Sequence, residues 1–193
     1  MNNLVAAATM PAKAGIIIST LQDCCSVKRR LYHYTCRAHL KGILHEGTIE
    51  PRTDSACYDP YGVPPLVWAS AAEPWEAMCS ATTAIGPCGG LEPLTVPGLP
   101  YEAARIQISF EAAEAWDVAM AKCGCQWWAI MRLAQAGYEQ DSDPGNWRAC
   151  RRPVAAGAWL AVELWDGGCW QCVPRAGRVY DIADLDAFMA TQG

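Results

Sequence analysis

Short apolar runs with an alternating or aromatic pattern recur along the chain and predict strands. Such runs are rich in β-branched and aromatic side chains, which suit a pleated and half-buried surface. They are LYHY at 31–34, LVWAS at 66–70, RIQISF at 105–110 and WLAVELW at 159–165, with a further short strand expected at 151–154. Asp166-Gly167-Gly168 is typical of a tight turn, so 169–173 is expected to complete a hairpin.

Strict alternation within 159–165 divides that strand into two faces. It places Leu160, Val162 and Leu164 on the core face, and Ala161, Glu163 and Trp165 on the opposite face.

Helical spacing is clearest over 37–46, where Leu40, Ile43 and Leu44 form one apolar face. Gly47 follows in the position where a left-handed residue commonly ends a helix. Four further helices are expected: 74–82 with Pro74 in its first turn, 111–117, 127–136 ended by Gly137, and 182–189 with Asp181 as N-cap.

The order of these elements predicts the fold class. Strands and helices are interspersed, but the strands are short, and the Gly- and Pro-rich stretches 53–65 and 85–100 predict long loops. This is not the regular alternation of a doubly wound sheet. We therefore expect one α+β domain over residues 23–193, preceded by an Ala-rich N-terminal extension at 1–22.

The composition of the 193 residues is that of a globular protein, with 52% hydrophobic and 18% charged residues. The formal net charge of −5 argues against strong nonspecific binding of nucleic acid. Arg148, Arg151 and Arg152 nevertheless form a local basic cluster. No apolar run approaches the length of a membrane span, so no membrane partner is expected.

The eleven cysteines indicate a reducing compartment. No secretory signal is evident in the first residues, so we expect free thiols and a cytoplasmic location. A zinc site is the alternative, since Cys169 and Cys172 form a C-x-x-C and Cys123 and Cys125 a C-x-C. Structural zinc sites usually join two C-x2–4-C knuckles, and here one is irregular. We expect no bound metal.

The strand at 31–34 carries a histidine between two tyrosines, where a buried strand would ordinarily hold Val or Ile. His33 is either a core histidine with satisfied hydrogen bonds or a ligand-binding residue. The surrounding sequence, LYHYT followed by a helix ending ILHEG, a polar loop and LVWAS, resembles the front half of the ADP-ribosyltransferase fold. It is similar to the H-Y-type enzymes, which include the DNA-modifying toxins called DarT. The likeness covers residues 31–80 and, more loosely, 105–109 and 147–165.

This resemblance implies two small β-sheets with flanking short helices around an NAD cleft, and NAD as substrate. In such enzymes the histidine hydrogen-bonds a ribose hydroxyl and the amide of NAD, which is the role implied for His33. Tyr32 or Tyr34 would lie against the nicotinamide ring. Ser70 would support the nicotinamide ribose, and Thr35 and Trp68 belong to the same two motifs.

A catalytic glutamate is also implied, because the departure of nicotinamide leaves an oxocarbenium-like ribose that a carboxylate stabilises or orients. The family often carries this residue in an E-x-E or Q-x-E motif on a late strand, and this sequence has neither. Glu163 is the one acid on a late strand and is therefore the candidate. Arg105 and Arg148 are candidates for contacts with the NAD phosphates.

The implied activity is transfer of ADP-ribose from NAD to a protein or nucleic-acid acceptor, as in a toxin or a phage effector acting on its host. Within the same fold, an NAD glycohydrolase and an RNA 2′-phosphotransferase are alternatives, and the negative net charge argues against the latter. A noncatalytic module that binds a partner through aromatic patches is the third possibility, with His33 structural.

Overall fold

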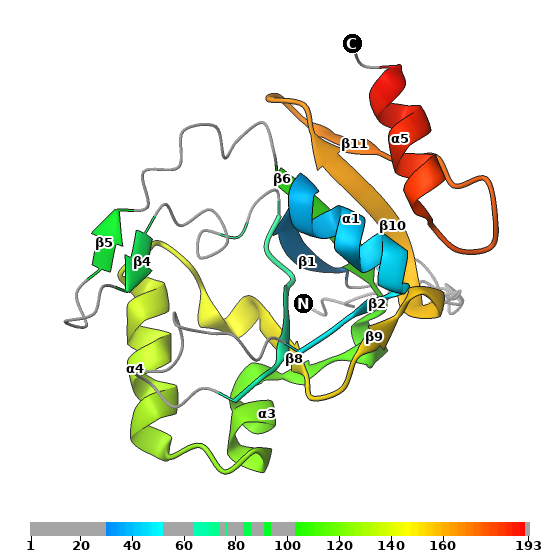
Figure 1. The fold of residues 1–193 in the computed structure, drawn as a ribbon. Coiled ribbons are helices and arrows are strands. Elements are labelled where there is room, and N and C mark those ends of the chain that lie inside the picture. The colour runs from blue at the N-terminus through cyan, green and yellow to red at the C-terminus, as the bar shows by residue number, and fades with distance from the viewer. Residues whose placement is uncertain are drawn as a thin grey trace, which may run out of the picture.

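The structure, a computed structural model, describes residues 30–51, 64–73, 76, 83–85, 91–93 and 103–191. For 83–85 and 91–93 it describes the backbone alone. The strands are β1 Leu31–Cys36, β2 Thr48–Ile49, β3 Val67–Ser70, β4 Thr83–Ile85, β5 Leu91–Pro93, β6 Ala103–Ile108, β7 Glu114–Ala115, β8 Trp147–Cys150, β9 Val154–Ala155, β10 Trp159–Trp165 and β11 Trp170–Cys172. The helices are α1 Arg37–Glu46, α3 Trp116–Lys122, α4 Trp127–Tyr138 and α5 Ile182–Ala190, with 3₁₀ turns at Phe110–Ala112, Pro144–Asn146 and Ala156–Ala158 (Figure 1).

The α+β class is confirmed. Seven strands form one antiparallel sheet in the order β11-β10-β6-β1-β3-β8-β7, and two further pairs, β2-β9 and β4-β5, stand apart from it. The expected two sheets are thus joined into one. The junction is narrow, because β1 and β3 share a single pair in register, Tyr32 with Ser70.

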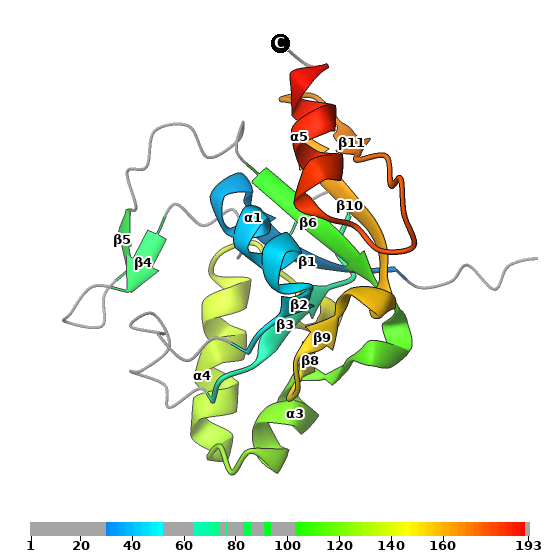
Figure 2. The same cartoon turned by 45° about the vertical axis from the view of Figure 1, so that its right-hand side comes forward.

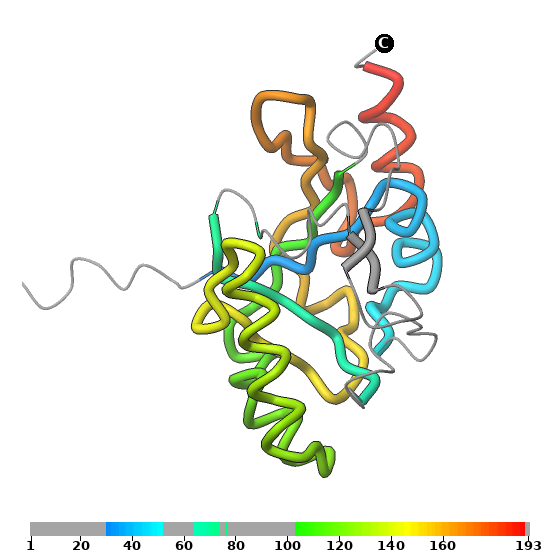
Figure 3. Tube along the Cα trace, turned by 90° about the vertical axis from the view of Figure 1, so that its left-hand side faces the viewer, coloured from blue at the N-terminus to red at the C-terminus, as the bar shows by residue number. Residues whose placement is uncertain are grey.

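The two faces of this sheet bury two apolar clusters. We call the face that carries Leu31, His33, Ile106 and Val162 the histidine face. There the sheet packs against α1 and α5 through Leu40, Leu44 and Leu185. The opposite face, the tyrosine face, carries Tyr32, Tyr34 and Arg105. Over β3 and β8 it is covered by α3 and α4. Figure 3 shows α1 and α5 on the side of the sheet away from α4, and Figure 2 shows α5 lying along β10 and β11.

Two predicted helix ends are confirmed. Gly47 has φ 66° and its N–H donates to Ile43 O, as expected of a left-handed residue that ends α1. Asp181 caps α5 by accepting from Asp184 N, while the Asp184 carboxylate accepts from Asp181 N. The two orphan donors at this helix start are therefore satisfied reciprocally.

Gly137 does not end its helix, because α4 continues to Tyr138. A Cβ built at Gly137 would lie 2.5 Å from the Trp147 ring, so the glycine allows close approach of the indole of β8. The prediction from sequence was wrong because a small residue can mark tight packing as well as a terminus.

The predicted core face of 159–165 was wrong at Leu160, which is exposed. The register of β10 against β6 shifts between Trp159 and Ala161, so Leu160 is the extra residue of a bulge. Trp159 thereby comes into phase with Val162 and Leu164 in the core.

Other predicted boundaries differ from the structure or fall outside it. Residues 111–117 hold a 3₁₀ turn, β7 and the start of α3 instead of one helix, and β8 precedes the strand expected at 151–154. The predicted loop 85–100 contains β5, paired with β4; Gly and Pro between two strands are equally typical of a hairpin connection. The extension 1–22, the loop over 53–63 and most of the helix predicted at 74–82 lie outside the described residues.

All six described cysteines are free thiols. Within the described part of the chain, no three His, Cys, Asp or Glu side chains gather as a metal site requires. Among these same residues, no helix has both the length and the hydropathy to cross a membrane.

Candidate functional site

The strand register brings four of the predicted site residues, Tyr32, Tyr34, Arg105 and Glu163, together on the tyrosine face. Directly opposed residues of antiparallel strands project to the same side of a sheet. Tyr34 lies opposite Arg105, and Arg105 lies opposite Glu163 on β10. Tyr32 shares this face through its register with Ser70.

His33 projects to the other face. It lies opposite Ile106, which in turn lies opposite Val162. Glu163 was expected to approach the same cleft as His33, and the register does not bring the two side chains together. The reason is the period of two along a strand, since β1 presents His33 and Tyr34 to opposite sides.

His33 is half-buried on β1, the central strand of the seven. Its Nδ1 lies 2.8 Å from the Trp68 carbonyl oxygen on β3. A carbonyl only accepts, so Nδ1 carries the proton in this arrangement, and Nε2 of the neutral ring is an acceptor. This hydrogen bond lies next to Tyr32–Ser70, the single register pair between β1 and β3. The His33 imidazole thus links the two strands where their backbone pairing ends.

Both tyrosines anchor the segment that follows β3. The Tyr34 hydroxyl donates to the Ala72 carbonyl oxygen at 2.8 Å, and the Tyr32 hydroxyl donates to the Glu73 carboxylate. Burial raises the pKa of Tyr32, and the hydrogen bond to Glu73 raises it further. The hydroxyls thus hold residues 71–73 across the tyrosine face of β1.

Arg105 is the centre of the tyrosine face and is 6% exposed. Its Nε donates to Glu163 Oε2 at 2.6 Å. Its guanidinium carbon lies 3.9 Å from the centre of the Tyr32 ring and 4.3 Å from that of Trp170. We call Tyr32, Tyr34, Arg105, Glu163 and Trp170 the Arg105 cluster. Cation–π contact with two rings stabilises a guanidinium that burial would otherwise penalise.

Ser70 lies in a buried hydrogen-bond network. Its hydroxyl donates to Glu76 and accepts from Ala72 N at 3.0 Å. Glu76 is 2% exposed and also accepts from Ser142, whose oxygen accepts from Trp147 Nε1 at 3.0 Å. The one proton of Ser70 is therefore committed inside the protein, and in this arrangement Ser70 cannot donate to a ribose.

The remaining predicted residues lie away from the Arg105 cluster. The Trp68 ring packs with Trp116 and Trp147 in the core below α3, while its carbonyl holds His33. Arg148 donates to two backbone carbonyls and lies over the Phe110 ring. Thr35 lies on the histidine face, opposite Ala104.

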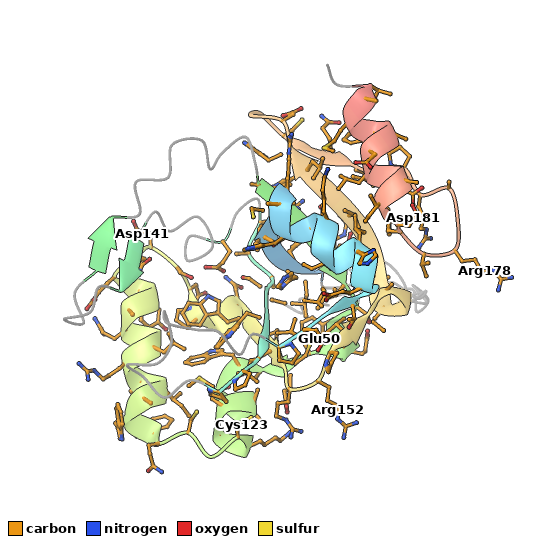
Figure 4. All side chains as sticks on the ribbon, in the orientation of Figure 1. Glu50, Cys123, Asp141, Arg152, Arg178 and Asp181 are labelled. Atoms are coloured by element: carbon orange, nitrogen blue, oxygen red, sulfur yellow. The ribbon has the colours of Figure 1, made fainter. Side chains whose placement is uncertain are left out.

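The basic cluster is an exposed edge, as its composition suggests. Arg151 pairs with Glu114 at 2.9 Å, and Arg152 extends from the ribbon into solvent (Figure 4).

Three residues of this region were not identified from the sequence. Glu76 falls in the first turn of the helix predicted at 74–82, but its carboxylate is buried and accepts hydrogen bonds from two hydroxyl groups. No local pattern links it to Ser142. Glu73 was passed over because nothing in the sequence pairs it with Tyr32. Trp170 could have been found, since the Asp-Gly-Gly turn places it opposite Trp165.

No family model, no curated protein and no solved structure matches this chain. The Arg105 cluster combines a flat apolar wall, a buried cation and a carboxylate. Such a combination can hold a ring, an anionic group and a hydroxyl of one ligand.

Proposed function

We propose that this protein is an NAD-dependent ADP-ribosyltransferase that modifies a macromolecular acceptor. The observation that carries the proposal is the convergence of Arg105, Glu163 and three aromatic rings on one face, on and beside the strand that bears His33. NAD offers matching chemistry: a flat nicotinamide ring, ribose hydroxyls and a diphosphate.

Within this proposal each group of the Arg105 cluster has a distinct role. Tyr34 and Trp170, whose ring centres are 6.0 Å apart, offer aromatic surface for the nicotinamide ring. Arg105 supplies the positive charge of the site for the diphosphate, and Glu163 fixes its orientation through Nε. His33 lies on the opposite face of β1, so within this proposal its part is to hold β1 to β3 through the bond from Nδ1–H to Trp68 O.

Glu163 is proposed as the carboxylate that stabilises the developing ribose cation. Its side chain is 17% exposed, which leaves it reachable while the surrounding apolar groups lower the local dielectric. The ion pair with Arg105 fixes its position. Glu73 is the competing carboxylate, because it is exposed and bound to the Tyr32 hydroxyl on the same face.

The test is incubation with NAD labelled separately in the nicotinamide and the adenine moiety, with cell extract as source of acceptor. Release of nicotinamide with transfer of the adenine label to macromolecules supports the transferase. Release without transfer supports the NAD glycohydrolase. The proposal would be wrong if the protein released no nicotinamide and calorimetry detected no binding of NAD.

Variants identify the carboxylate. Glu163→Gln keeps size and hydrogen bonding but removes charge, and we expect it to lower turnover about a hundredfold or more while NAD still binds. Glu73→Gln is the parallel variant on the same face. Glu50→Gln, at an exposed position before residues 52–63, is the control expected to leave turnover unchanged. A hundredfold loss in Glu73→Gln alone would transfer the role to Glu73.

A second function is favoured by a different observation. Trp127 and Trp128 at the start of α4 are 69% and 54% exposed, and Met131 and Tyr138 on the same helix are exposed as well. Exposed tryptophan, methionine and tyrosine are typical of protein interfaces. A noncatalytic module that binds a partner through α4 would have this surface. It would show no nicotinamide release, and loss of partner binding in Trp127→Ala.

A further inference from the structure

A cavity of about 220 Å³ lies at the far end of β10, away from His33. Its walls come from the start of α1, the β10–β11 hairpin and the end of α5, which lie together in the upper part of Figure 1. The residues that define its chemistry are Arg37, Trp165, Asp166, Gln171, Phe188 and Met189. Trp165 also touches the Arg105 cluster, through an edge-on contact with Trp170.

Arg37 contributes an unsatisfied cation to this cavity. Its Nη2 donates to the Trp165 carbonyl oxygen at 3.0 Å, and its Nε is buried without a hydrogen-bond partner. Buried donors in native proteins are nearly always paired, because an unpaired one carries the full desolvation cost. No carboxylate is within salt-bridge distance of Arg37 in the described residues. Because Nε is itself buried, a ligand in the cavity would pair with the terminal nitrogens of the guanidinium and supply the counter-ion that Arg37 lacks among the described residues.

The backbone at the same place also favours an anion. Arg37 is the first residue of α1, and the N-cap residue Cys36 makes no side-chain capping bond. The first turn of α1 contains no acidic residue. The positive end of the helix dipole therefore reinforces the charge of Arg37.

Asp166 limits the charge that the cavity accepts. Its carboxylate accepts from the N–H groups of Gly168 and Cys169 and from Gln171 Nε2, so it is held in place as an anion. An anion with two or more charges would be repelled by this wall, whereas a single carboxylate directed to Arg37 would not. The opposite wall is apolar, since Phe188 and Met189 of α5 pack against the core there.

We propose that this cavity binds a small aromatic carboxylate, with its charged group on Arg37 and its ring against the two apolar residues of α5. The site is separate from the one proposed for NAD and does not depend on it.

Titration of the full chain with benzoate and benzamide tests the proposal, followed by chemical-shift changes of the tryptophan indole N–H signals and by calorimetry. Benzamide has the ring without the charge, and inorganic phosphate has the charge without the ring. Benzoate should bind with a Kd below about 10 mM and move the Trp165 signal, and the other two should bind at least tenfold more weakly. Equal binding of all three, or no benzoate binding, would overturn the proposal.

Matched variants distinguish the loss of the Arg37 charge from a loss of folding. Arg37→Gln should weaken benzoate at least tenfold, while Lys41→Gln, which removes the same charge from the exposed side of α1, should leave the Kd unchanged. Met189→Trp fills the cavity and keeps Arg37, so it should abolish binding of benzoate even if Arg37→Gln fails to fold. Unaltered binding in Met189→Trp would place the ligand elsewhere. NAD turnover should be independent of all three substitutions, so this test and that of the proposed transferase fail separately.

Discussion

Arg105 and Glu163 form an ion pair on adjacent strands, with Nε 2.6 Å from Oε2 and both side chains mostly buried. The two residues are directly opposed in the β6–β10 ladder, so the backbone register itself holds the pair in place. Tyr32 and Trp170 cover the guanidinium from two sides.

Breaking this pair from one side should be costly. Glu163→Leu or Arg105→Leu leaves one buried charge without its partner and should lower the free energy of unfolding by on the order of 3 kcal/mol. The double variant leaves neither charge, and we expect it to be more stable than either single variant. Urea denaturation of all four chains measures the coupling. Additive single effects would mean that the pair does not interact.

The bond from His33 to Trp68 predicts a difference between two substitutions. Asn places an N–H donor close to the position of Nδ1 and should keep the bond to the carbonyl, while Ala should lose about 1 kcal/mol of stability. Both variants lack Nε2, but only Asn keeps the bond that positions β1 against β3, so His33→Asn should keep more NAD turnover than His33→Ala. Denaturation and nicotinamide release, measured on the same preparations, separate the two roles. Equal turnover in the two variants would show that the bond to Trp68 has no part in the reaction.

Gly137 and Gly42 form a matched pair of helical glycines. At Gly137 an added methyl group would meet the Trp147 ring at 2.5 Å, whereas at Gly42 nothing lies within 4 Å. Gly137→Ala should destabilise by about 1–3 kcal/mol through overpacking. Gly42→Ala should stabilise by about 0.5–1 kcal/mol, because alanine favours the helix and restricts the unfolded chain. Thermal unfolding of both variants, with effects of opposite sign, is the check.

Asp166 should give the hairpin an acid-sensitive component. Hydrogen bonds from Cys169 N and then from Gly168 N hold the pKa of this carboxyl well below its ordinary value. A lowered folded-state pKa stabilises the protein above the unfolded value of about 3.9, and this contribution is lost as the pH falls toward the folded value. Melting temperatures between pH 7 and pH 2 should therefore fall less steeply in Asp166→Asn. Parallel curves for the two chains would contradict the assignment.

Thiol reactivity should differ among the cysteines. Burial, and secondly the nearby Glu114 carboxylate, raises the pKa of Cys150 to about 11, and its Sγ donates to Ala112 O. The hydrogen bond to Asp166 raises the pKa of Cys169. Among the six described cysteines, alkylation with iodoacetamide at pH 8, followed by peptide mass mapping, should label exposed Cys123 before Cys169, and Cys150 last. Cys169 should react faster in Asp166→Asn than in the unchanged chain.

The elements that the sequence predicted correctly are those with a local signal. The turn at Asp166-Gly167-Gly168, the glycine that ends α1 and the cap at Asp181 each depend on a few neighbouring residues. The strands β1, β3, β6 and β10 were located because their apolar runs are short and bounded by breakers.

The errors arose where a distant residue decides the outcome. Leu160 is displaced from the core by the register between β10 and β6, which no pattern within 159–165 encodes. A glycine is needed at position 137 because the Trp147 ring lies against it. The buried carboxylate of Glu76 is stabilised by the hydroxyl of Ser142. For the site, the pairing of Arg105 with Glu163 could have followed from the strand order, but that order was not readable from the chain.

Only one register pair, Tyr32 with Ser70, joins β1 to β3, so the sheet consists of two halves with a weak backbone connection between them. On one side β1, β6, β10 and β11 are joined by continuous ladders, and on the other β3, β8 and β7 are joined likewise. Separating the two halves there would break one bridge, the imidazole bond to Trp68, the tyrosine bonds to Ala72 and Glu73, and the shared apolar core that holds Val67 and Ala69 of β3 with Leu31 and Ile106, and it would leave every other ladder of the sheet intact. The line beside His33 is thus where the backbone pairing of the sheet is weakest, so local opening should begin there before the ladders on either side separate.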